Sequence, residues 1–274
     1  MSTKRKILIW ALVLILAIIF AAVWIAEGDE AELAMAEVTG TDPTLAKPDS
    51  EMIPTVQIAK PIGWAAGEAP HAGEGLTVTR FAEALDHPRV LHTLPNGDVL
   101  VTLTRAPKSE DDEGGFTEWV AGLLMSRAGA TGESPDELVL LRDADGNGTA
   151  EQRFVLTDDL ESPSGIAWAD DTLYVANHDA LLAFSYALGA TQITAEPRKL
   201  MDLPAGGNHW MRNLALDREG THIYVAVGSA SNIAEKGIEA EEGRAAIWEY
   251  DIENDSQRIF ATGLRNPNGL AWNP

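Results

Sequence analysis

Residues 163–168 read Pro-Ser-Gly-Ile-Ala-Trp, and after a short turn residues 173–176 read Leu-Tyr-Val-Ala. A related pair follows, in which Asn-Leu-Ala-Leu at 213–216 precedes Ile-Tyr-Val-Ala at 223–226. Pro-Asn-Gly-Leu-Ala-Trp at 267–272 opens a third copy. Repeats of about 40–50 residues made of short strands are typical of β-propellers, in which each repeat forms one antiparallel blade. The repeat therefore predicts an all-β propeller. An all-β sandwich, which also has regularly spaced strands, is the alternative.

Short apolar runs separated by turn residues continue this pattern from residue 76 onward. The turn Pro95-Asn96-Gly97-Asp98 joins two such runs and predicts a hairpin. The predicted strands are 78–81, 90–94, 99–103, 137–142, 152–156, 165–168, 172–176, 181–186 and 221–227. Residues 115–130 are apolar at near-helical spacing, which predicts a short helix that packs on the propeller face.

The segment from Ile7 to Ala26 contains no charged residue. Twenty helical residues span ~30 Å, the thickness of the hydrocarbon core of a bilayer. Basic residues precede this segment and acidic residues follow it, so the positive-inside rule keeps the N-terminus in the cytoplasm and exports the rest. We expect an uncleaved membrane anchor. A signal peptide cleaved after Ala36 is the alternative, although its apolar region would be unusually long.

Three parts follow from these patterns. Residues 1–26 form the cytoplasmic tip and transmembrane anchor. Residues 27–75, rich in Ala, Glu, Asp, Pro and Gly, form a mostly extended stalk, within which 30–38 prolong the helix by a turn or two. Residues 76–274 form a partial propeller.

The composition excludes several classes of function. The formal net charge of −22 argues against binding to nucleic acid, whose phosphates require Lys and Arg. The chain has no cysteine, which excludes disulfides, thiolate metal sites, cysteine nucleophiles and lipoprotein acylation. The sequence also has no Walker loop, Rossmann fingerprint, zinc motif or Gly-x-Ser-x-Gly elbow.

Three blocks carry a resemblance to a known family: Gly-Gly-Asn-His-Trp-Met-Arg-Asn at 206–213, Ala-Glu-Glu-Gly-Arg-Ala-Ala-Ile-Trp at 240–248, and Gly-Leu-Arg-Asn-Pro-Asn-Gly-Leu-Ala-Trp at 263–272. Together they resemble the glucose/sorbosone dehydrogenase family, and the sorbosone dehydrogenase branch is closer. The resemblance covers residues 76–274. It implies a six-bladed propeller and a quinoprotein that uses pyrroloquinoline quinone (PQQ) to oxidise a sugar.

His209 is the candidate catalytic residue. Neutral imidazole is a good general base near neutral pH, and oxidation of an alcohol or hemiacetal requires removal of the hydroxyl proton as hydride leaves carbon. The resemblance implies that His209 takes this proton while the quinone accepts the hydride. The alternative is a loop histidine held by the backbone.

Arg265 and Asn266 are the candidate cofactor residues. A guanidinium and an amide donor stabilise the negative charge that develops on the oxygens of a reduced quinone. The resemblance places this pair beside the quinone, and it adds Asn232 and Arg212 from matching blocks to the same pocket. The alternative is an Arg-Asn-Pro turn that caps a strand.

Asp143, Asp145 and Asn147 lie at alternate positions of a Gly-containing loop that resembles a calcium loop. Position twelve of an EF-hand frame is Phe154, so the bidentate carboxylate is missing and a hairpin turn is favoured over a metal site. The resemblance also implies a calcium ion that bridges to the quinone, with its main ligands expected beyond Pro274.

Residues 76–274 hold about four blades of 40–50 residues, whereas the resembled family closes six. We therefore expect a piece of a longer propeller. Expressed alone, residues 76–274 are expected to aggregate or to melt with low cooperativity, and not to bind PQQ stably, because open sheet edges and unpaired blade faces remain.

The sequence predicts a membrane-anchored quinoprotein dehydrogenase facing the periplasm or the outside of the cell. It would oxidise a sugar, aldose or related alcohol and pass electrons to a respiratory acceptor. The rival hypothesis is a non-catalytic propeller that binds a glycan or a protein partner through the same face, because one fold serves many functions.

Overall fold

The computed structural model describes residues 3–26, 33–45, 58–65, 67–107 and 116–273. Its contacts divide the chain into two compact units. One consists of residues 1–61 with 123–129, and the other of residues 62–122 with 130–274. Each is described by itself.

The first unit contains the helix α1 (Thr3–Ala26), which confirms the predicted N-terminal helix. The stretch of α1 from residue 3 to residue 23 is long and apolar enough to cross a membrane. A signal sequence has the same properties. The predicted prolongation of the helix fails at residues 33–38, where the N–H of Glu37 donates to the carbonyl of Ala34 and closes a turn. Residues 30–32 lie outside the described part of the chain.

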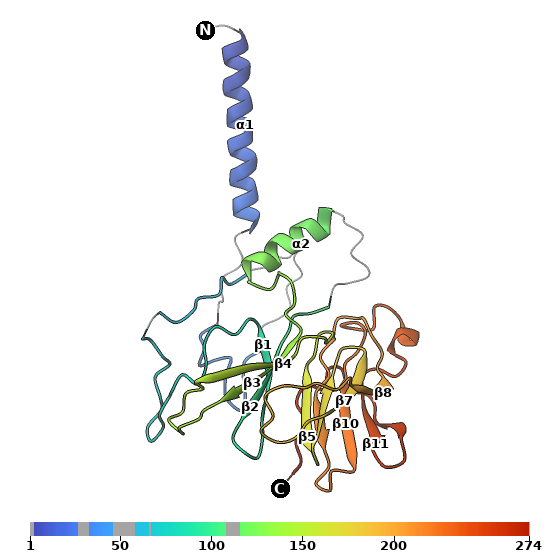
Figure 1. The fold of residues 1–274 in the computed structure, drawn as a ribbon. Coiled ribbons are helices and arrows are strands. Elements are labelled where there is room, and N and C mark those ends of the chain that lie inside the picture. The colour runs from blue at the N-terminus through green and yellow to red at the C-terminus, as the bar shows by residue number, and fades with distance from the viewer. Residues whose placement is uncertain (1–2, 27–32, 46–57, 66, 108–115, 274) are drawn as a thin grey trace. The chain divides into compact units, whose positions relative to one another are not determined.

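Three four-stranded antiparallel sheets make up most of the second unit (Figure 1). Each is a meander, in which strands that follow one another in the sequence are neighbours. Sheet 1 consists of β1 (Pro88–Thr93), β2 (Val99–Leu103), β3 (Glu137–Arg142) and β4 (Gln152–Thr157). Sheet 2 consists of β5 (Gly165–Ala169), β6 (Thr172–Ala176), β7 (Ala180–Ser185) and β8 (Arg198–Asp202). Sheet 3 consists of β9 (Leu214–Leu216), β10 (His222–Val227), β11 (Ala246–Asp251) and β12 (Ser256–Ala261).

Of the nine strands listed above from the sequence, all but one are confirmed, with ends that differ by at most two residues. The exception is 78–81, which is not a strand: Phe81 packs on one face of sheet 1 and its carbonyl accepts a single hydrogen bond, from the N–H of Ala150. The predicted helix is present as α2 (Phe116–Arg127). Its packing on the sheets stays a prediction, since the side chains of Trp119, Leu123 and Met125 are more than half exposed.

Alternation along β6 shows how the sheets pack. Leu173 and Val175 belong to an apolar cluster shared with Leu100, Leu138 and Leu140 of sheet 1. Tyr174 and Ala176 point to the other face, into a cluster shared with Ile223, Val225 and Val227 of sheet 3. A strand buried on both faces has a continuous apolar sequence, as β6 does. Sheet 2 is therefore sandwiched between sheets 1 and 3.

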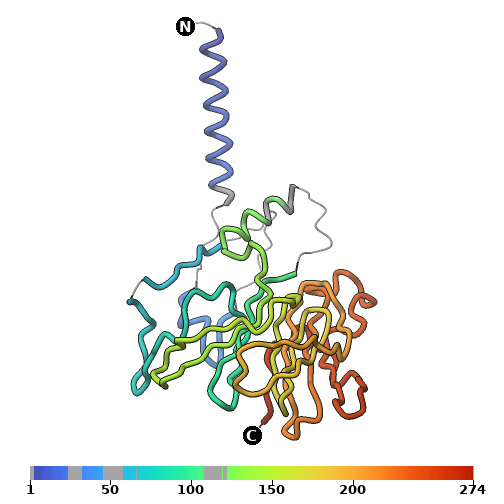
Figure 2. The backbone as a smooth tube through the Cα atoms, viewed as in Figure 1, coloured from blue at the N-terminus to red at the C-terminus, as the bar shows by residue number. Residues whose placement is uncertain are grey.

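The first strands of the three sheets lie next to one another, because β5 contacts both β1 and β9 (Figure 2). Stacked four-stranded meanders whose first strands are neighbours are arranged like consecutive blades of a propeller. The all-β prediction is confirmed. The described residues contain three such sheets in place of the expected four or so.

The predicted opening strand of a further blade, within 267–272, is not formed: residues 262–273 contain no strand. A strand requires a neighbour that completes its backbone hydrogen bonds, and none of the described residues pairs with this segment. Instead Trp272 packs on the outer face of sheet 3. Its indole ring meets the ring of Tyr224 edge to face at 5.3 Å, and both line an apolar cavity of about 140 Å³.

An ion pair anchors the hairpin between β1 and β2. Nε and Nη2 of Arg142 donate to the two carboxylate oxygens of Asp98 at 2.7 and 2.6 Å. Asp98 is only 2 % exposed. The hydrogen bond from Arg142 is the main cause that lowers the pKa of Asp98, and burial acts in the opposite direction.

We expect Asp98→Asn to lower the free energy of unfolding by about 1.5–3 kcal/mol at pH 7, the contribution of hydrogen bonds to a charged group. Because folding lowers the pKa of Asp98, its stabilisation is full above the unfolded pKa of about 3.9 and is lost as the pH falls below it. The difference between variant and parent should therefore shrink in acid. Urea melts at pH 7 and pH 3.5 measure it, with exposed Asp158→Asn as the charge-matched control. A deficit for Asp98→Asn that is equal at both pH values would contradict this role.

Candidate functional site

Three loops that carry the predicted site residues meet at one end of sheet 3. The strand pairs Leu214–Val225, Val227–Ala246 and Ile247–Ala261 show that β9 and β11 begin, and β10 and β12 end, on the same side of the sheet. The loop before β9 carries His209, the loop after β10 carries Asn232, and the segment after β12 carries Arg265 and Asn266.

Gly228 is the point at which two of these loops converge. A Cβ atom placed on Gly228 would lie 2.5 Å from Cβ of His209 and 2.6 Å from Oδ1 of Asn266. Real Cβ atoms essentially never approach other atoms so closely, so only glycine admits both neighbours. The next residue also holds the segment after β12, since the N–H of Ser229 donates to the carbonyl of Arg265 at 2.7 Å.

His209 is half-buried, and its Nδ1 atom faces Ser229. Nδ1 lies 2.9 Å from the carbonyl oxygen and 3.0 Å from the hydroxyl oxygen of Ser229. Among the described residues, Nε2 of His209 has no hydrogen-bond partner. Ser229 thus holds one ring nitrogen, and the other is unpaired in the described part of the chain.

Arg265 and Asn232 form a pair at the surface of the site. Nε of Arg265 donates to the carbonyl of Asn232 at 2.8 Å, and Nη2 donates to its side-chain Oδ1 at 2.9 Å. Both residues are exposed. Nη1 has no partner among the described residues. The pairing fixes the plane of the guanidinium and keeps an N–H edge for an anionic group.

Arg212 lies beneath the loop that carries His209. It is fully buried, and its guanidinium donates only to carbonyl oxygens: Nη1 to those of His209 and Met211 at 2.8 and 3.1 Å, and Nη2 to that of Pro204 at 2.7 Å. Burial, followed by the charge of Arg244, lowers the pKa of Arg212 to about 9. The structure therefore places Arg212 as a support of the loop, while its predicted role toward a cofactor stays a prediction.

Arg244 is a second support of the same loop. Its Nη2 donates to the carbonyl of Pro204 at 2.9 Å and to that of Ala205. The loop is also tied to the strand end of β10, where the N–H of Asn208 donates to the carbonyl of Ala230 at 2.8 Å. Two buried arginines and one backbone bond thus fix the position of His209.

Glu241 fixes the loop that faces His209. Its Oε2 accepts the N–H of Ala230 at 2.7 Å, and its Oε1 accepts the N–H and hydroxyl of Ser231 at 3.2 and 2.8 Å. Burial acts to raise the pKa of Glu241, but these hydrogen bonds outweigh it and the pKa is lowered. An ionised Glu241 therefore caps the turn that follows β10.

Five residues of the site did not emerge as functional from the sequence. Two of them lie within the quoted block 240–248 and three lie in the loop after β10, and the sequence does not show which of these side chains meet. They are Gly228, Ser229, Ser231, Glu241 and Arg244.

Asp143, Asp145 and Asn147 do not join the site. They form the hairpin between β3 and β4, in which the Asp143 carboxylate accepts the N–H groups of Gly146, Asn147 and Gly148. The N–H of Gly148 is the main cause that lowers the pKa of Asp143. Oxygens of Asp143, Asp145 and Glu151 lie within 4.8 Å of one another, and the side chains of Glu161, His178 and Asp179 form a second group with ligand atoms this close. The hairpin reading agrees with these bonds, and the predicted metal site stays a prediction.

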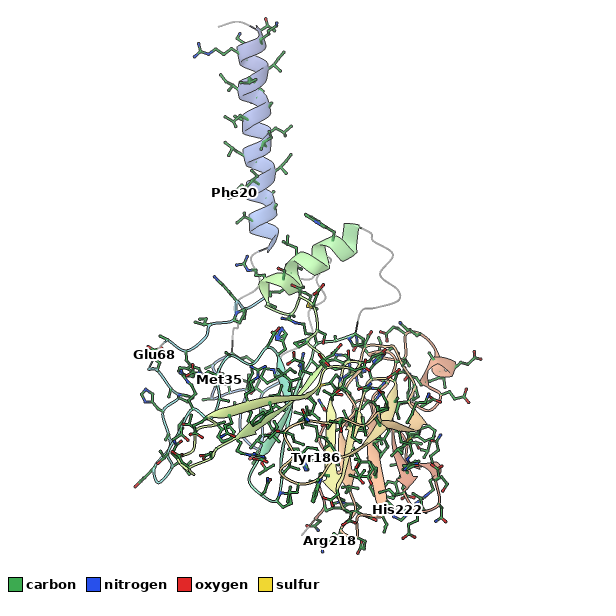
Figure 3. The ribbon with its side chains drawn as sticks, in the orientation of Figure 1. Phe20, Met35, Glu68, Tyr186, Arg218 and His222 are labelled. Carbon is green, nitrogen blue, oxygen red and sulfur yellow. The ribbon has the colours of Figure 1, made fainter. Side chains whose placement is uncertain are left out.

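A larger cavity opens at the other end of the first strands. Its volume is about 420 Å³, and its lining includes Thr93, Trp168 and Leu216 near the ends of β1, β5 and β9. Figure 3 marks Arg218, another lining residue, and the neighbouring His222 at this end of sheet 3. The cavity is therefore separate from the loops around His209.

Comparison with known proteins was made on both sequence and structure. A family model described as TrAA12-like matches residues 137–274, just over half of the chain. No curated protein matched in sequence. Among solved structures, the Trichoderma reesei carbohydrate-active enzyme of family AA12 has a TM-score of 0.51 at 18 % identity, over 78 % of this chain and 48 % of that one. At this identity the similarity shows a shared fold and nothing more.

Two further structures are more distant. The PQQ domain of pyranose dehydrogenase from Coprinopsis cinerea has a TM-score of 0.48 at 20 % identity, over 66 % of this chain and 40 % of that one. The PQQ-bound aldose sugar dehydrogenase from Streptomyces coelicolor has a TM-score of 0.40 at 17 % identity, over 67 % and 50 %. The chain thus spans about half the length of these structures or less. The match over residues 137–274, which contains every loop of the site, shows that the chain belongs to the TrAA12-like family.

Proposed function

We propose that this chain carries part of the active site of a quinoprotein oxidoreductase that oxidises a sugar, aldose or related alcohol, with PQQ as the hydride acceptor. The observation that carries the proposal is the convergence of His209 and Asn266 on Gly228, beside the fixed guanidinium of Arg265. A base and two donors for an anionic acceptor are the groups that this reaction requires. Membership of the TrAA12-like family and the fold shared with a carbohydrate-active enzyme support a carbohydrate substrate.

The donor set fits PQQ, which carries carboxylates and two neighbouring quinone oxygens. Arg265 presents Nη1 without a partner in the described part of the chain, and the amides of Asn232 and Asn266 lie at the exposed rim of the same loops. The chain as a whole has a formal charge of −22, yet the guanidinium of Arg265 has no carboxylate partner among the described residues. A calcium ion bridging to the quinone belongs to the proposal, with its main ligands outside the loops described.

Each residue of the site has a role in this proposal. Bound PQQ would supply the chemistry of hydride acceptance. Nε2 of His209 would take the substrate hydroxyl proton. Arg265, Asn266 and Asn232 would orient the quinone and offset negative charge on its oxygens. Arg212 and Arg244 would act through the loop, by holding His209 where its lone pair meets the substrate.

The finer parts of the proposal rest on the sequence alone. They are the sorbosone dehydrogenase-like branch, a closed ring of six blades, the anchoring of residues 1–26 in the inner membrane through α1, the stalk at 27–75, and a partial propeller over 76–274 on the periplasmic or outer side. Electrons would leave to a respiratory acceptor.

Reconstitution tests the proposal. The full chain in detergent is mixed with PQQ and calcium, and reduction of an electron-accepting dye is followed with a panel of aldoses, beside His209→Ala. We expect quinone binding by both proteins and sugar-dependent dye reduction by the parent only. Absence of quinone binding together with binding to a glycan array would refute the proposal and favour the rival, a non-catalytic module for a glycan or protein partner.

Arg265→Lys tests the cofactor role. Lysine retains the charge but loses the planar fork that reaches both oxygens of Asn232, so we expect PQQ to bind about 10–150-fold more weakly, the loss of one charge-assisted hydrogen bond. Fluorescence titration with PQQ measures the affinity. Arg218→Lys, at the opposite end of sheet 3, is the matched control. Superimposable titration curves for Arg265→Lys and parent would rule out this role.

A further inference from the structure

We propose that Ser229 is a positioning residue that fixes His209 in the tautomer with the proton on Nδ1, so that Nε2 is the nitrogen that accepts a proton. The assignment of the tautomer stands on geometry alone. Its catalytic consequence rests on the proposed function of His209 as the base.

The proton on Nδ1 follows from its two neighbours. The carbonyl oxygen of Ser229, 2.9 Å away, has only lone pairs and accepts. The hydroxyl oxygen of Ser229, 3.0 Å away, can donate only one proton, and the carbonyl of Ser231 accepts that proton at 2.7 Å. Nδ1 therefore faces two acceptors, and only a protonated Nδ1 satisfies them.

The contact between Nδ1 of His209 and Ser229 is held rigidly enough to select one tautomer. Ser229 is 7 % exposed and Ser231 is 1 % exposed, so water does not readily replace the bonds between them. Glu241 holds the N–H and hydroxyl of Ser231, which keeps the accepting carbonyl of Ser231 turned toward Ser229. On the other side, Cβ of His209 is packed against Gly228, which limits movement of the ring away from Ser229.

A neutral imidazole has one donor and one acceptor nitrogen, and the hydrogen bond made by one nitrogen sets the role of the other. With Nδ1–H bound by Ser229, the lone pair of Nε2 is unprotonated and has no partner among the described residues. Ser229 thus orients the ring and prepares the accepting nitrogen without touching the substrate.

Nitrogen NMR of the full chain, labelled with ¹⁵N-histidine in detergent, measures the tautomer directly. The signals of His209 are identified by their loss in His209→Gln. Above the pH at which the ring is neutral, we expect a pyrrole-type Nδ1 and a pyridine-type Nε2 for His209. A pyrrole-type Nε2, or signals averaged between the two tautomers, would overturn the assignment.

Kinetics and NMR of Ser229→Ala test the side chain. Its loss leaves one acceptor of two, so we expect a detectable population of the Nε2–H tautomer and a ~3–10-fold fall in kcat with KM nearly unchanged, the effect of one hydrogen bond. Ser256→Ala, an exposed serine at the opposite end of sheet 3, is the control. An unchanged tautomer in Ser229→Ala would refute the role of the hydroxyl. A changed tautomer in a chain whose parent oxidises no sugar would refute the proposed function and leave the tautomer assignment standing.

Discussion

His209→Ala is expected to lower the turnover of PQQ-dependent sugar oxidation by ~10²–10⁴-fold, the usual contribution of a general base. Binding of PQQ should change little, because the proposed donors to the quinone lie on other loops. The backbone should also tolerate the change, since Arg212 and the N–H of Asn208 hold the loop through backbone carbonyls that alanine leaves in place.

The measurement is steady-state dye reduction with a saturating sugar, together with a PQQ titration of the same preparation. His71→Ala is the matched control, because His71 is exposed and lies outside the three loops. Turnover of His209→Ala within a few-fold of the parent would reassign His209 to a structural role. Loss of PQQ binding in parallel with turnover would instead show that the imidazole belongs to the cofactor pocket.

Much of the fold could be predicted because the sequences of the central strands reflect how each strand is buried. β6 is buried on both faces and is apolar throughout, and the turn 95–98 has the residues that a tight hairpin requires. β8, β9, β11 and β12 were not among the predicted strands, and β8 and β12 were missed for the opposite reason. β12 reads Ser-Gln-Arg-Ile-Phe-Ala and is largely exposed, so its pairing with β11 defines it as a strand, while its own pattern does not.

The loops that form the site could be predicted from the sequence, but the contacts between their side chains could not. The blocks around His209, Arg265 and Asn266 stood out, yet nothing in them shows that Arg212 is fully buried or that Ser229 faces the imidazole. These contacts depend on which strand ends of sheet 3 meet. That register is set by pairing between distant residues, which a single sequence does not display.

Gly228→Ala is expected to damage the site as severely as loss of the base. Gly228 has no positive φ, so its backbone conformation suits any residue and the cost of the substitution is steric. The new methyl group would lie 2.5 Å from Cβ of His209 and 2.6 Å from Oδ1 of Asn266. Oδ1 of Asn266 ends an exposed side chain that can rotate away, but Cβ of His209 is fixed by the backbone, so relief of that contact requires the loops to separate.

We expect a loss of about 1–3 kcal/mol in stability, the usual cost of overpacking. Turnover should fall by ~10²-fold or more, because a displacement of about 1 Å is enough to misplace a catalytic group. Thermal melts and dye reduction measure the two effects. Gly122→Ala in α2 is the matched control: a Cβ there meets no atom within 4 Å, and alanine favours a helix over glycine by up to about 1 kcal/mol.

A double-mutant cycle separates the steric cause from general damage. In a His209→Gly background the nearest obstacle is absent, so Gly228→Ala should cost less stability there than in the parent, and the two changes should be coupled. Melts of the two single variants and the double variant give the coupling energy. Additive losses would show that the methyl group does not press on His209. Unchanged turnover in Gly228→Ala would show that the approach of His209 and Asn266 at this glycine is not the geometry on which catalysis depends.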